Sequence, residues 1–225
     1  MANRCFIKRN GTWQPLRPKK KVNGQWVDCP AYLKENGQWV RIDQQLVTKT
    51  AIIEGYAQWN GSWRNSSGTG GASYYRSDNI YQGKYSSYHY LGLMCFADLF
   101  NQARNTGTIT KVELRLKNNH AYYNTGLKTK ICGAWSLPST SPTTAYFDWS
   151  DSNAYTGEWH FGKNASSPQW ITLDSRIHGA IQNGSLNGLR LLSPSGFSLN
   201  DYGYFEGSNA NRPYIKITVQ YQVWE

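Results

Sequence analysis

The side chains best suited to acid–base catalysis lie between residues 148 and 158. Glycoside hydrolysis needs one carboxylic acid to protonate the leaving oxygen and one carboxylate to act as base or nucleophile. Asp148 or Asp151, paired with Glu158, has the right chemistry. Both aspartates, however, lie in the loop-like string 148–153, where Asp usually accepts hydrogen bonds from nearby backbone amides. We therefore expect a structural use for them and no catalytic centre.

Two histidines are further candidates for proton transfer, because imidazole titrates near neutral pH. His160 follows Trp159, and His178 comes shortly after Asp174. A nucleophilic mechanism would also need a Ser or Cys beside such a base, and neither histidine has one in a recognisable setting. We expect surface or core histidines, and a protein that is not an enzyme.

The metal-binding chemistry has one candidate site. Asp148, Asp151 and Asn153 bring hard oxygen ligands together, which suits Ca²⁺, but the glycine and terminal glutamate of a calcium loop are missing. The four cysteines, at positions 5, 29, 95 and 132, form no Cys-x-x-Cys pair and have no nearby His. This spacing argues against zinc. We expect free thiols, no resident metal and no cofactor.

The aromatic residues offer a different chemistry, the recognition of a sugar. A sugar presents an apolar CH face and a rim of hydroxyls, so its site needs an exposed ring beside polar groups. Tyrosines gather with such groups in segments 74–90, 118–124 and 201–206. A competing interpretation is that about half of these rings pack the core or a subunit interface. The predicted ligand-binding residues are Tyr74, Tyr75, Tyr85, Tyr88, His89, Tyr122, Tyr123, Trp149, Trp159, Tyr202 and Tyr204.

A short sequence repeat lies at the start of the chain, before most of these residues. Asn-Gly-x-Trp occurs at 10–13, 23–26, 36–39 and 60–63, and the first three copies are 13 residues apart. Asn-Gly favours the positive φ angles of a type I′ turn, so each copy predicts a β-hairpin with one Trp just past its turn. A lone hairpin is marginal in water and must bury its Trp against other copies or partners. The predicted attachment residues are Trp13, Trp26, Trp39 and Trp63.

The composition and charge favour a β-rich contact protein. The chain has 16 Tyr and 10 Trp and a net charge of +10. Residues 1–49 carry ten Lys or Arg against three acids, and residues 50–225 carry fourteen against eleven. This bias favours an anionic partner for the repeat region, although we interpret the lysine run 19–21 as a solvated connector. No nucleic-acid-binding motif accompanies the charge, so we expect no nucleic acid partner.

The N-terminal sequence lacks the apolar core of a signal peptide. Apolar runs stay well short of the roughly 20 residues that a membrane span requires. We expect synthesis in the cytoplasm, no membrane insertion, and release through assembly or lysis.

Residues beyond 70 read as a series of short strands. Alternation of apolar and polar residues in 109–116 and 214–221 is typical of strands with one face in a core, which favours a β-sandwich. Segments 96–103 and 175–181 predict short helices, whereas 45–54 fits a strand or a helix. The Ser- and Gly-rich stretch 65–71 predicts a linker. The other predicted strands are 90–96, 127–132 and 188–192. We therefore predict two domains, an attachment region, 1–70, and a head, 71–225.

Several segments beyond residue 90 follow one another in a recognisable order: Gly92–Phe96 with Asp98 and Leu99, Ile109–Leu116, Trp170–Asp174, Gly188–Leu191, Tyr204–Gly207 and Arg212–Thr218. With this order, residues 74–222 resemble the jelly-roll domains called DNRLRE, or disaggregatase-related. Those domains contain a Phe-Asp-Leu strand, an Ala-x-Leu-x-Leu strand and a closing Glu … Arg-Pro-x-Leu strand. The resemblance implies an all-β fold, with β-hairpin repeats followed by a jelly-roll β-sandwich, and a carbohydrate-contacting or adhesive module.

The repeat Val-Asn-Gly-x-Trp-Val at 22–27 is similar to repeats at the start of small tail and baseplate proteins of bacteriophages. This resemblance implies a virion tail fibre or receptor-binding protein that contacts other tail proteins and attaches to a host cell-wall glycan or another anionic surface polymer. A homotrimer would bury the Trp rows and multiply weak sugar contacts. Two alternatives stay open: a virion structural protein, such as a head fibre or decoration subunit, and a cell-wall polysaccharide depolymerase.

Overall fold

The computed structural model describes residues 6–9, 11–15, 18–41, 46–66, 73–122, 126–135, 154–163, 167–194 and 201–224. Its contacts divide the chain into two compact units, residues 1–49 with 222–225 and residues 50–221. The boundary thus falls at Lys49 and Thr50, earlier than the predicted position near residue 70. The reason is that strand β8 (Trp59–Ser66) and most of β7 (Leu46–Tyr56) pair within the sheets of the larger unit.

The described part of the smaller unit contains three two-stranded antiparallel sheets, each a β-hairpin. At the second and third turns, Asn23, Gly24, Asn36 and Gly37 have φ angles of 47°, 84°, 49° and 84°, as a type I′ turn requires. The hairpins predicted for the first three repeats are therefore confirmed. Their strands are β1 (Phe6–Arg9), β2 (Thr12–Pro15), β3 (Lys19–Val22), β4 (Gln25–Asp28), β5 (Tyr32–Glu35) and β6 (Gln38–Arg41).

The fourth repeat does not form a hairpin turn, and that prediction is wrong. Residues 60–63 continue strand β8, which pairs antiparallel with β11 (Tyr88–Cys95) from Ser66 opposite Tyr88 to Trp59 opposite Cys95. The Asn60 side-chain amide donates hydrogen bonds to the carbonyls of Ser77 and Gly207, both at 2.9 Å. Tertiary hydrogen bonds thus hold extended a tetrapeptide that elsewhere makes a turn.

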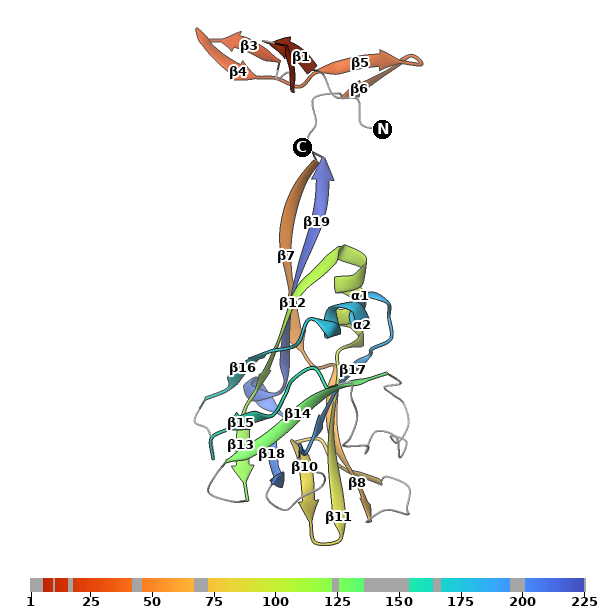
Figure 1. Ribbon diagram of the computed structural model, residues 1–225, viewed down its shortest axis with the longest axis vertical. Helices are drawn as coiled ribbons and strands as arrows, with labels where there is room; N and C mark the ends of the chain where they lie inside the picture. The colour runs from red at the N-terminus through yellow and green to blue at the C-terminus, as the bar shows by residue number, and fades with distance from the viewer. Residues whose placement is uncertain are drawn as a thin grey trace. The chain divides into compact units, whose positions relative to one another are not determined.

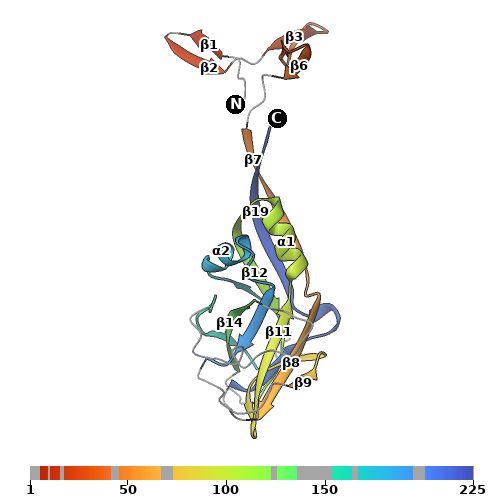
Figure 2. The same cartoon turned by 90° about the vertical axis from the view of Figure 1, so that its right-hand side faces the viewer.

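The larger unit is a jelly-roll-like β-sandwich of two antiparallel sheets (Figures 1 and 2), so the predicted all-β fold is confirmed. One sheet has the order β13-β18-β10-β11-β17-β14-β15, with β8 and β9 joined through β11, and the other has the order β16-β12-β19-β7. The remaining strands are β9 (Ser73–Arg76), β10 (Asn79–Tyr85), β12 (Thr108–Leu116), β13 (Asn118–Ala121), β14 (Leu127–Ala134), β15 (Trp159–Phe161), β16 (Gln169–Thr172), β17 (Gly188–Leu192), β18 (Gly203–Glu206) and β19 (Tyr214–Trp224).

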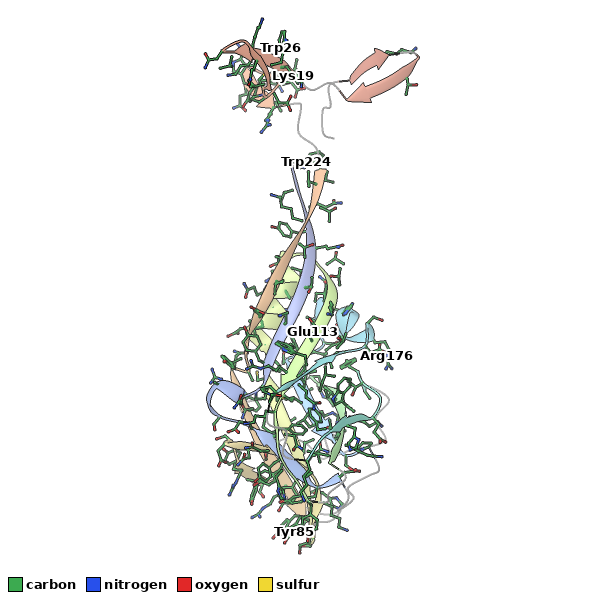
Figure 3. All side chains as sticks on the ribbon, turned by 90° about the vertical axis from the view of Figure 1, so that its left-hand side faces the viewer. Lys19, Trp26, Tyr85, Glu113, Arg176 and Trp224 are labelled. Carbon is green, nitrogen blue, oxygen red and sulfur yellow. The ribbon has the colours of Figure 1, made fainter. Side chains whose placement is uncertain are left out.

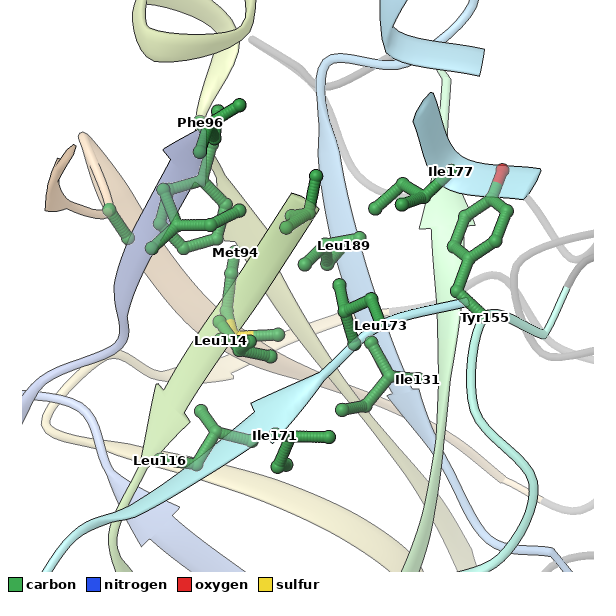
Figure 4. Close-up of a cluster of buried hydrophobic side chains, with 14 of the residues drawn as sticks. Met94, Phe96, Leu114, Leu116, Ile131, Tyr155, Ile171, Leu173, Ile177 and Leu189 are labelled. Carbon is green, nitrogen blue, oxygen red and sulfur yellow. The ribbon is translucent and has the colours of Figure 1, made fainter. Parts of the chain in front are cut away.

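The core lies between the two sheets. Strand β12 buries its alternate residues Val112, Leu114 and Leu116, and these face apolar side chains of the larger sheet such as Met94 and Leu189 (Figure 4). Burying one such side chain stabilises the fold by about 1.5–3 kcal/mol. The alternation read from the sequence therefore gives the correct inward face of this strand.

Two short helices cover one end of the core. Helix α1 (Ala97–Thr106) and helix α2 (Arg176–Gln182) match the predicted helical segments, and a 3₁₀ turn, η3 (Asn209–Asn211), precedes β19. The helices pack against each other and against β12, burying Phe100 and Ile177. The undecided segment 45–54 is a strand over the residues the structure describes, because it belongs to β7.

Gly83 in strand β10 has a left-handed, crowded backbone position that a substitution can test. Its φ is +86°, and a Cβ there would lie 2.5 Å from the Asp201 carbonyl oxygen. We expect Gly83→Ala to lower the free energy of unfolding by about 2 kcal/mol or more, since the left-handed backbone alone costs about 1–2 kcal/mol. Gly179, exposed in α2 with open space around its Cβ position, is the control: Gly179→Ala should raise stability by up to about 1 kcal/mol. Urea unfolding of the full chain measures both, and equal stabilities would contradict the assignment.

Candidate functional site

Tyrosines from segments far apart in the sequence converge at one end of the sandwich. We define the tyrosine cluster by its rings, which come from β9, β10, β11, the residue after β13, and the start of β18. Figure 3 shows Tyr85 at this end, and Figures 1 and 2 show the β10–β11 hairpin lying away from the two helices. Members lie 4.7–6.5 Å from their neighbours, centroid to centroid. The members are Tyr75, Tyr81, Tyr85, Tyr88, Tyr90, Tyr122, Tyr202 and Tyr204.

Sheet register explains why these rings meet. Tyr85 lies opposite Tyr88 across the β10–β11 pair, and Tyr81 lies opposite Tyr204 across the β10–β18 pair. Residues directly opposite on antiparallel strands place their side chains on the same face. The three Tyr-rich segments of the sequence are therefore joined into one surface by strand pairing.

The most exposed corner of the cluster is formed by Tyr85, Tyr122 and Tyr202. Tyr85 stacks on Tyr202 with centroids 5.0 Å apart and an interplanar angle of 26°, and Tyr122 lies 5.8 Å from Tyr85. Tyr85 and Tyr122 are each 44% exposed. This corner offers the exposed ring surface of Tyr85 and Tyr122 to a ligand, and Tyr202 packs against both rings.

Two arginines lie against rings of the cluster. The Arg64 guanidinium carbon lies 4.5 Å from the Tyr88 centroid and 4.8 Å from that of Tyr75. The Arg76 guanidinium carbon lies 5.0 Å from Tyr75 and 5.6 Å from Tyr81. Tyr75 thus contacts both cations, and it also packs edge-on against Tyr81 at 5.2 Å. We call these two arginines and three tyrosines the cation–tyrosine stack.

The row of rings continues onto β18 and β13. Tyr81 lies 4.7 Å from Tyr204, and His120 stacks on Tyr204 at 5.2 Å with an interplanar angle of 23°. The neighbouring Asn119 donates a hydrogen bond to the Glu206 carboxylate at 2.7 Å. Polar side chains therefore border the rings, as a sugar-binding surface requires.

Three buried phenols of the cluster, those of Tyr81, Tyr90 and Tyr202, stay protonated at neutral pH. Burial is the largest cause that raises the pKa of Tyr81, to about 12, and it also raises the pKa values of Tyr90 and Tyr202. A protonated phenol both donates and accepts hydrogen bonds. The cluster consequently presents neutral hydroxyls together with the permanent positive charges of the two arginines.

Several predicted ligand-binding residues do not join the cluster. Tyr74 packs edge-on against Trp63 at 5.5 Å. His89 alternates with Tyr88 and Tyr90 along β11 and so lies on the other face; burial lowers its pKa and nearby Lys84 adds to the effect. Trp159 packs against the core and donates a hydrogen bond to Gln169. Tyr123 and Trp149 lie outside the described residues.

The residues considered for catalysis make other contacts. Glu158 pairs with Lys128 at 2.5 Å on the surface. The Asp174 carboxylate accepts hydrogen bonds from the backbone and side chain of Arg176, both 2.9 Å, and these bonds lower its pKa. The pKa of His178 is lowered, chiefly by burial. Asp148 and Asp151, the other half of the acid pair, lie outside the described residues, and His160 is exposed in β15.

Metal binding is not supported within the described ranges, where no group of three or more His, Cys, Asp or Glu is arranged to hold an ion. The proposed calcium ligands, Asp148, Asp151 and Asn153, lie outside those ranges. Cys95 and Cys132 are free thiols, and burial raises the pKa of each. Cys29 is also free.

The attachment tryptophans divide into two groups. Trp26 and Trp39 are 66% and 68% exposed, whereas Trp63 is 8% exposed and packs with Leu91 and Leu93 on the outer side of the larger sheet. The prediction that Trp63 mediates attachment is therefore wrong, because its strand belongs to the sandwich. The Trp13 side chain is outside the described part of the structure.

The three hairpins share one register. Lys8 lies opposite Trp13, Lys21 opposite Trp26, and Lys34 opposite Trp39. The second and third hairpins therefore each present a Lys and a Trp on the same face, directly across from one another. The 13-residue spacing repeats a side-chain pair as well as a turn.

Sequence reasoning missed a second aromatic–cation row, on the outer face of the four-stranded sheet. Arg115 lies opposite Trp170 on β16 and Tyr214 on β19, with its guanidinium carbon 4.9 Å from Tyr214 and 5.7 Å from Tyr56. Arg212 lies 4.6 Å from Tyr56. The alternating pattern predicts that these residues face outward, but only the pairing of four separate strands brings them into one row. Arg64 was missed for a related reason, since its segment was read as a turn.

Comparisons with known proteins identify no relative. No protein-family model matches the chain, and no curated protein matches it significantly. Among the described residues, the helices are too short or too polar to cross a bilayer.

The contrast between the repeats predicts opposite effects of the same substitution. We expect Trp63→Ala to lower the free energy of unfolding by about 3–5 kcal/mol, because it empties a buried site. Trp26→Ala should leave that value within about 0.5 kcal/mol, since an exposed ring loses little on truncation. Chemical unfolding of the two full-length variants measures both values. A large loss for Trp26→Ala in the isolated chain would mean that its ring is buried.

Proposed function

We propose that this chain is a virion tail adhesin that attaches to host cell-surface carbohydrate. In this proposal the tyrosine cluster binds the carbohydrate, and the exposed hairpins of residues 1–49 attach the chain to the particle. The function is one of contact and includes no catalytic step.

The observation that carries the proposal is the convergence of the tyrosines at one end of the sandwich. Tyr85 and Tyr122 expose ring surface. The phenol of Tyr202 packs against Tyr85, and the Asn119 amide lies further along the same row of rings. Sugars bind to this combination, because their CH faces pack on rings while their hydroxyls need donors and acceptors. Single contacts of this kind are weak, which favours the presentation of several copies together.

The hairpins support the attachment half of the proposal. Every described side chain of β3, β4, β5 and β6 is exposed, so these strands have no core of their own. Two-stranded hairpins of this kind gain stability when another surface covers them. Because the hairpins share a register, a partner that presents equivalent surfaces, such as other tail proteins or further copies in a homotrimer, can engage them all.

The adhesin proposal predicts that the fluorophore-labelled full chain labels cells of a strain susceptible to the phage. A fragment that starts at residue 71 is unsuitable, since it would lack β7 and β8. We expect the double variant Tyr85→Ala, Tyr122→Ala to bind such cells about tenfold more weakly or worse, because two exposed rings are lost. Tyr56→Ala, a truncation of a comparably exposed ring (37%) on another face, is the control and should label cells normally. Equal labelling by all variants would exclude the tyrosine cluster as the surface that binds cells. No labelling by the wild type would refute the proposal that the chain is an adhesin.

The attachment proposal predicts a separate defect for the hairpin variant Trp26→Ala, Trp39→Ala. We expect it to fold and to label cells, but to be incorporated into particles less than the wild type, since its contact rings are gone. Incorporation is measured by immunoblotting purified virions after complementation. Native mass spectrometry of the isolated chain should show three copies, and a monomer at micromolar concentration would contradict the homotrimer. Normal incorporation of the variant would remove the hairpin rings from the attachment surface.

A further inference from the structure

The cation–tyrosine stack restricts what the cluster can recognise. Arg64 and Arg76 both lie against the Tyr75 ring, with their guanidinium carbons within about 5 Å of its centroid. Tyr88 and Tyr81 each have one of these arginines within 6 Å of the ring centroid. These rings are therefore already in contact with cations, and what this part of the surface adds to the cluster is the positive charge of two guanidinium groups.

The charge on these arginines is poorly neutralised. Arg76 has Asp78 at 3.7 Å from its Nε, with both side chains well exposed, and such pairs contribute about 0–1 kcal/mol. No carboxylate of the described residues forms an ion pair with Arg64, and its Nε is buried without a hydrogen-bond partner.

We propose that the ligand of the tyrosine cluster is an anionic glycan or polyol polymer whose phosphate or carboxylate groups are bound by Arg64 and Arg76. This inference rests on the proposed adhesin function and narrows its substrate class. A guanidinium group that packs against two rings has its planar fork of donors restrained, and that fork matches the oxygens of carboxylate and phosphate. The adjacent corner of Tyr85 and Tyr122 then packs against the uncharged part of the repeating unit.

The stack also explains why arginine is used here in place of lysine. A planar guanidinium can lie against a ring and still donate from its edge, whereas an ammonium is a compact point charge that prefers full hydration. Arg64→Lys should therefore lose much of the binding even though the charge is kept.

The test measures binding of the full chain to wall glycan purified from a susceptible strain. The glycan is used untreated, with its carboxyl groups amidated, or with its phosphate groups removed. We expect the wild type to bind the untreated glycan and to lose at least tenfold in affinity for one of the two treated forms, which identifies the anion. Raising the salt concentration from about 0.05 M to about 0.5 M should weaken binding, because the ligand charges are screened.

Variants of the stack complete the test. Arg76→Gln and Arg64→Gln should each weaken binding to untreated glycan at least tenfold, while Arg115→Gln, which changes the same kind of cation–ring contact on the other sheet, should bind as the wild type does. The Arg76 side chain is 41% exposed, so Arg76→Gln should keep the wild-type thermal midpoint. If Arg64→Gln unfolds, the binding of Arg76→Gln alone decides whether the anion site exists. Equal loss in Arg115→Gln would show that the charge effect is unspecific and would overturn the proposal.

Two further outcomes separate this inference from the function on which it rests. If wild type and Arg76→Gln bind all three glycan preparations equally, the ligand is neutral; the anion site is refuted and the adhesin stands. If the wild type binds none of the preparations and no cells, both proposals fail.

Discussion

The division of one edge of strand β11 between two partners is the constraint on which the site depends. The undivided edge of β11 pairs with β8 along the whole length of the strand. The divided edge pairs with β10 near Tyr88 and Tyr90 and with β17 from Gly92 to Cys95. One half of β11 therefore contributes rings to the exposed end and the other half contributes Met94 to the core. Because both halves belong to one strand, core packing fixes the position of the tyrosine cluster.

The cluster combines two kinds of contact that serve different purposes. Ring-on-ring packing, as between Tyr81 and Tyr204, stabilises the fold by about 0.5–1.5 kcal/mol for each pair beyond the area buried. The arginines hold β8 and β9 to β10 and β11, since Arg64 of β8 contacts Tyr88 of β11 and Arg76 of β9 contacts Tyr81 of β10. They also carry charge that the protein leaves largely unpaired. A surface that is rigid yet electrostatically incomplete is suited to binding with little reorganisation.

The sequence predicted the positions of strands and helices better than it predicted which strands pair with one another. Alternation located β12 and β19 and their buried faces, and tyrosine-rich segments located most of the cluster. The fourth Asn-Gly-x-Trp was misread because local turn propensity was outweighed by the hydrogen bonds that Asn60 makes with Ser77 and Gly207. A sequence signal did exist: Lys precedes Asn by two residues in the first three copies and Gln58 replaces it in the fourth. Arg64 and the row around Arg115 depend on strand pairing, which no local pattern encodes.

The same tetrapeptide thus serves two opposite energetic roles. In β8 its Trp is buried, so its apolar surface already stabilises the sandwich and is not available to a partner. In the hairpins about two thirds of the Trp26 and Trp39 surface remains in water, and covering a ring of this size is worth about 1.5–3 kcal/mol. That free energy would be released only if another surface packed on the hairpins, as the proposed assembly requires. The sandwich that carries the tyrosine cluster, in contrast, buries a core of its own.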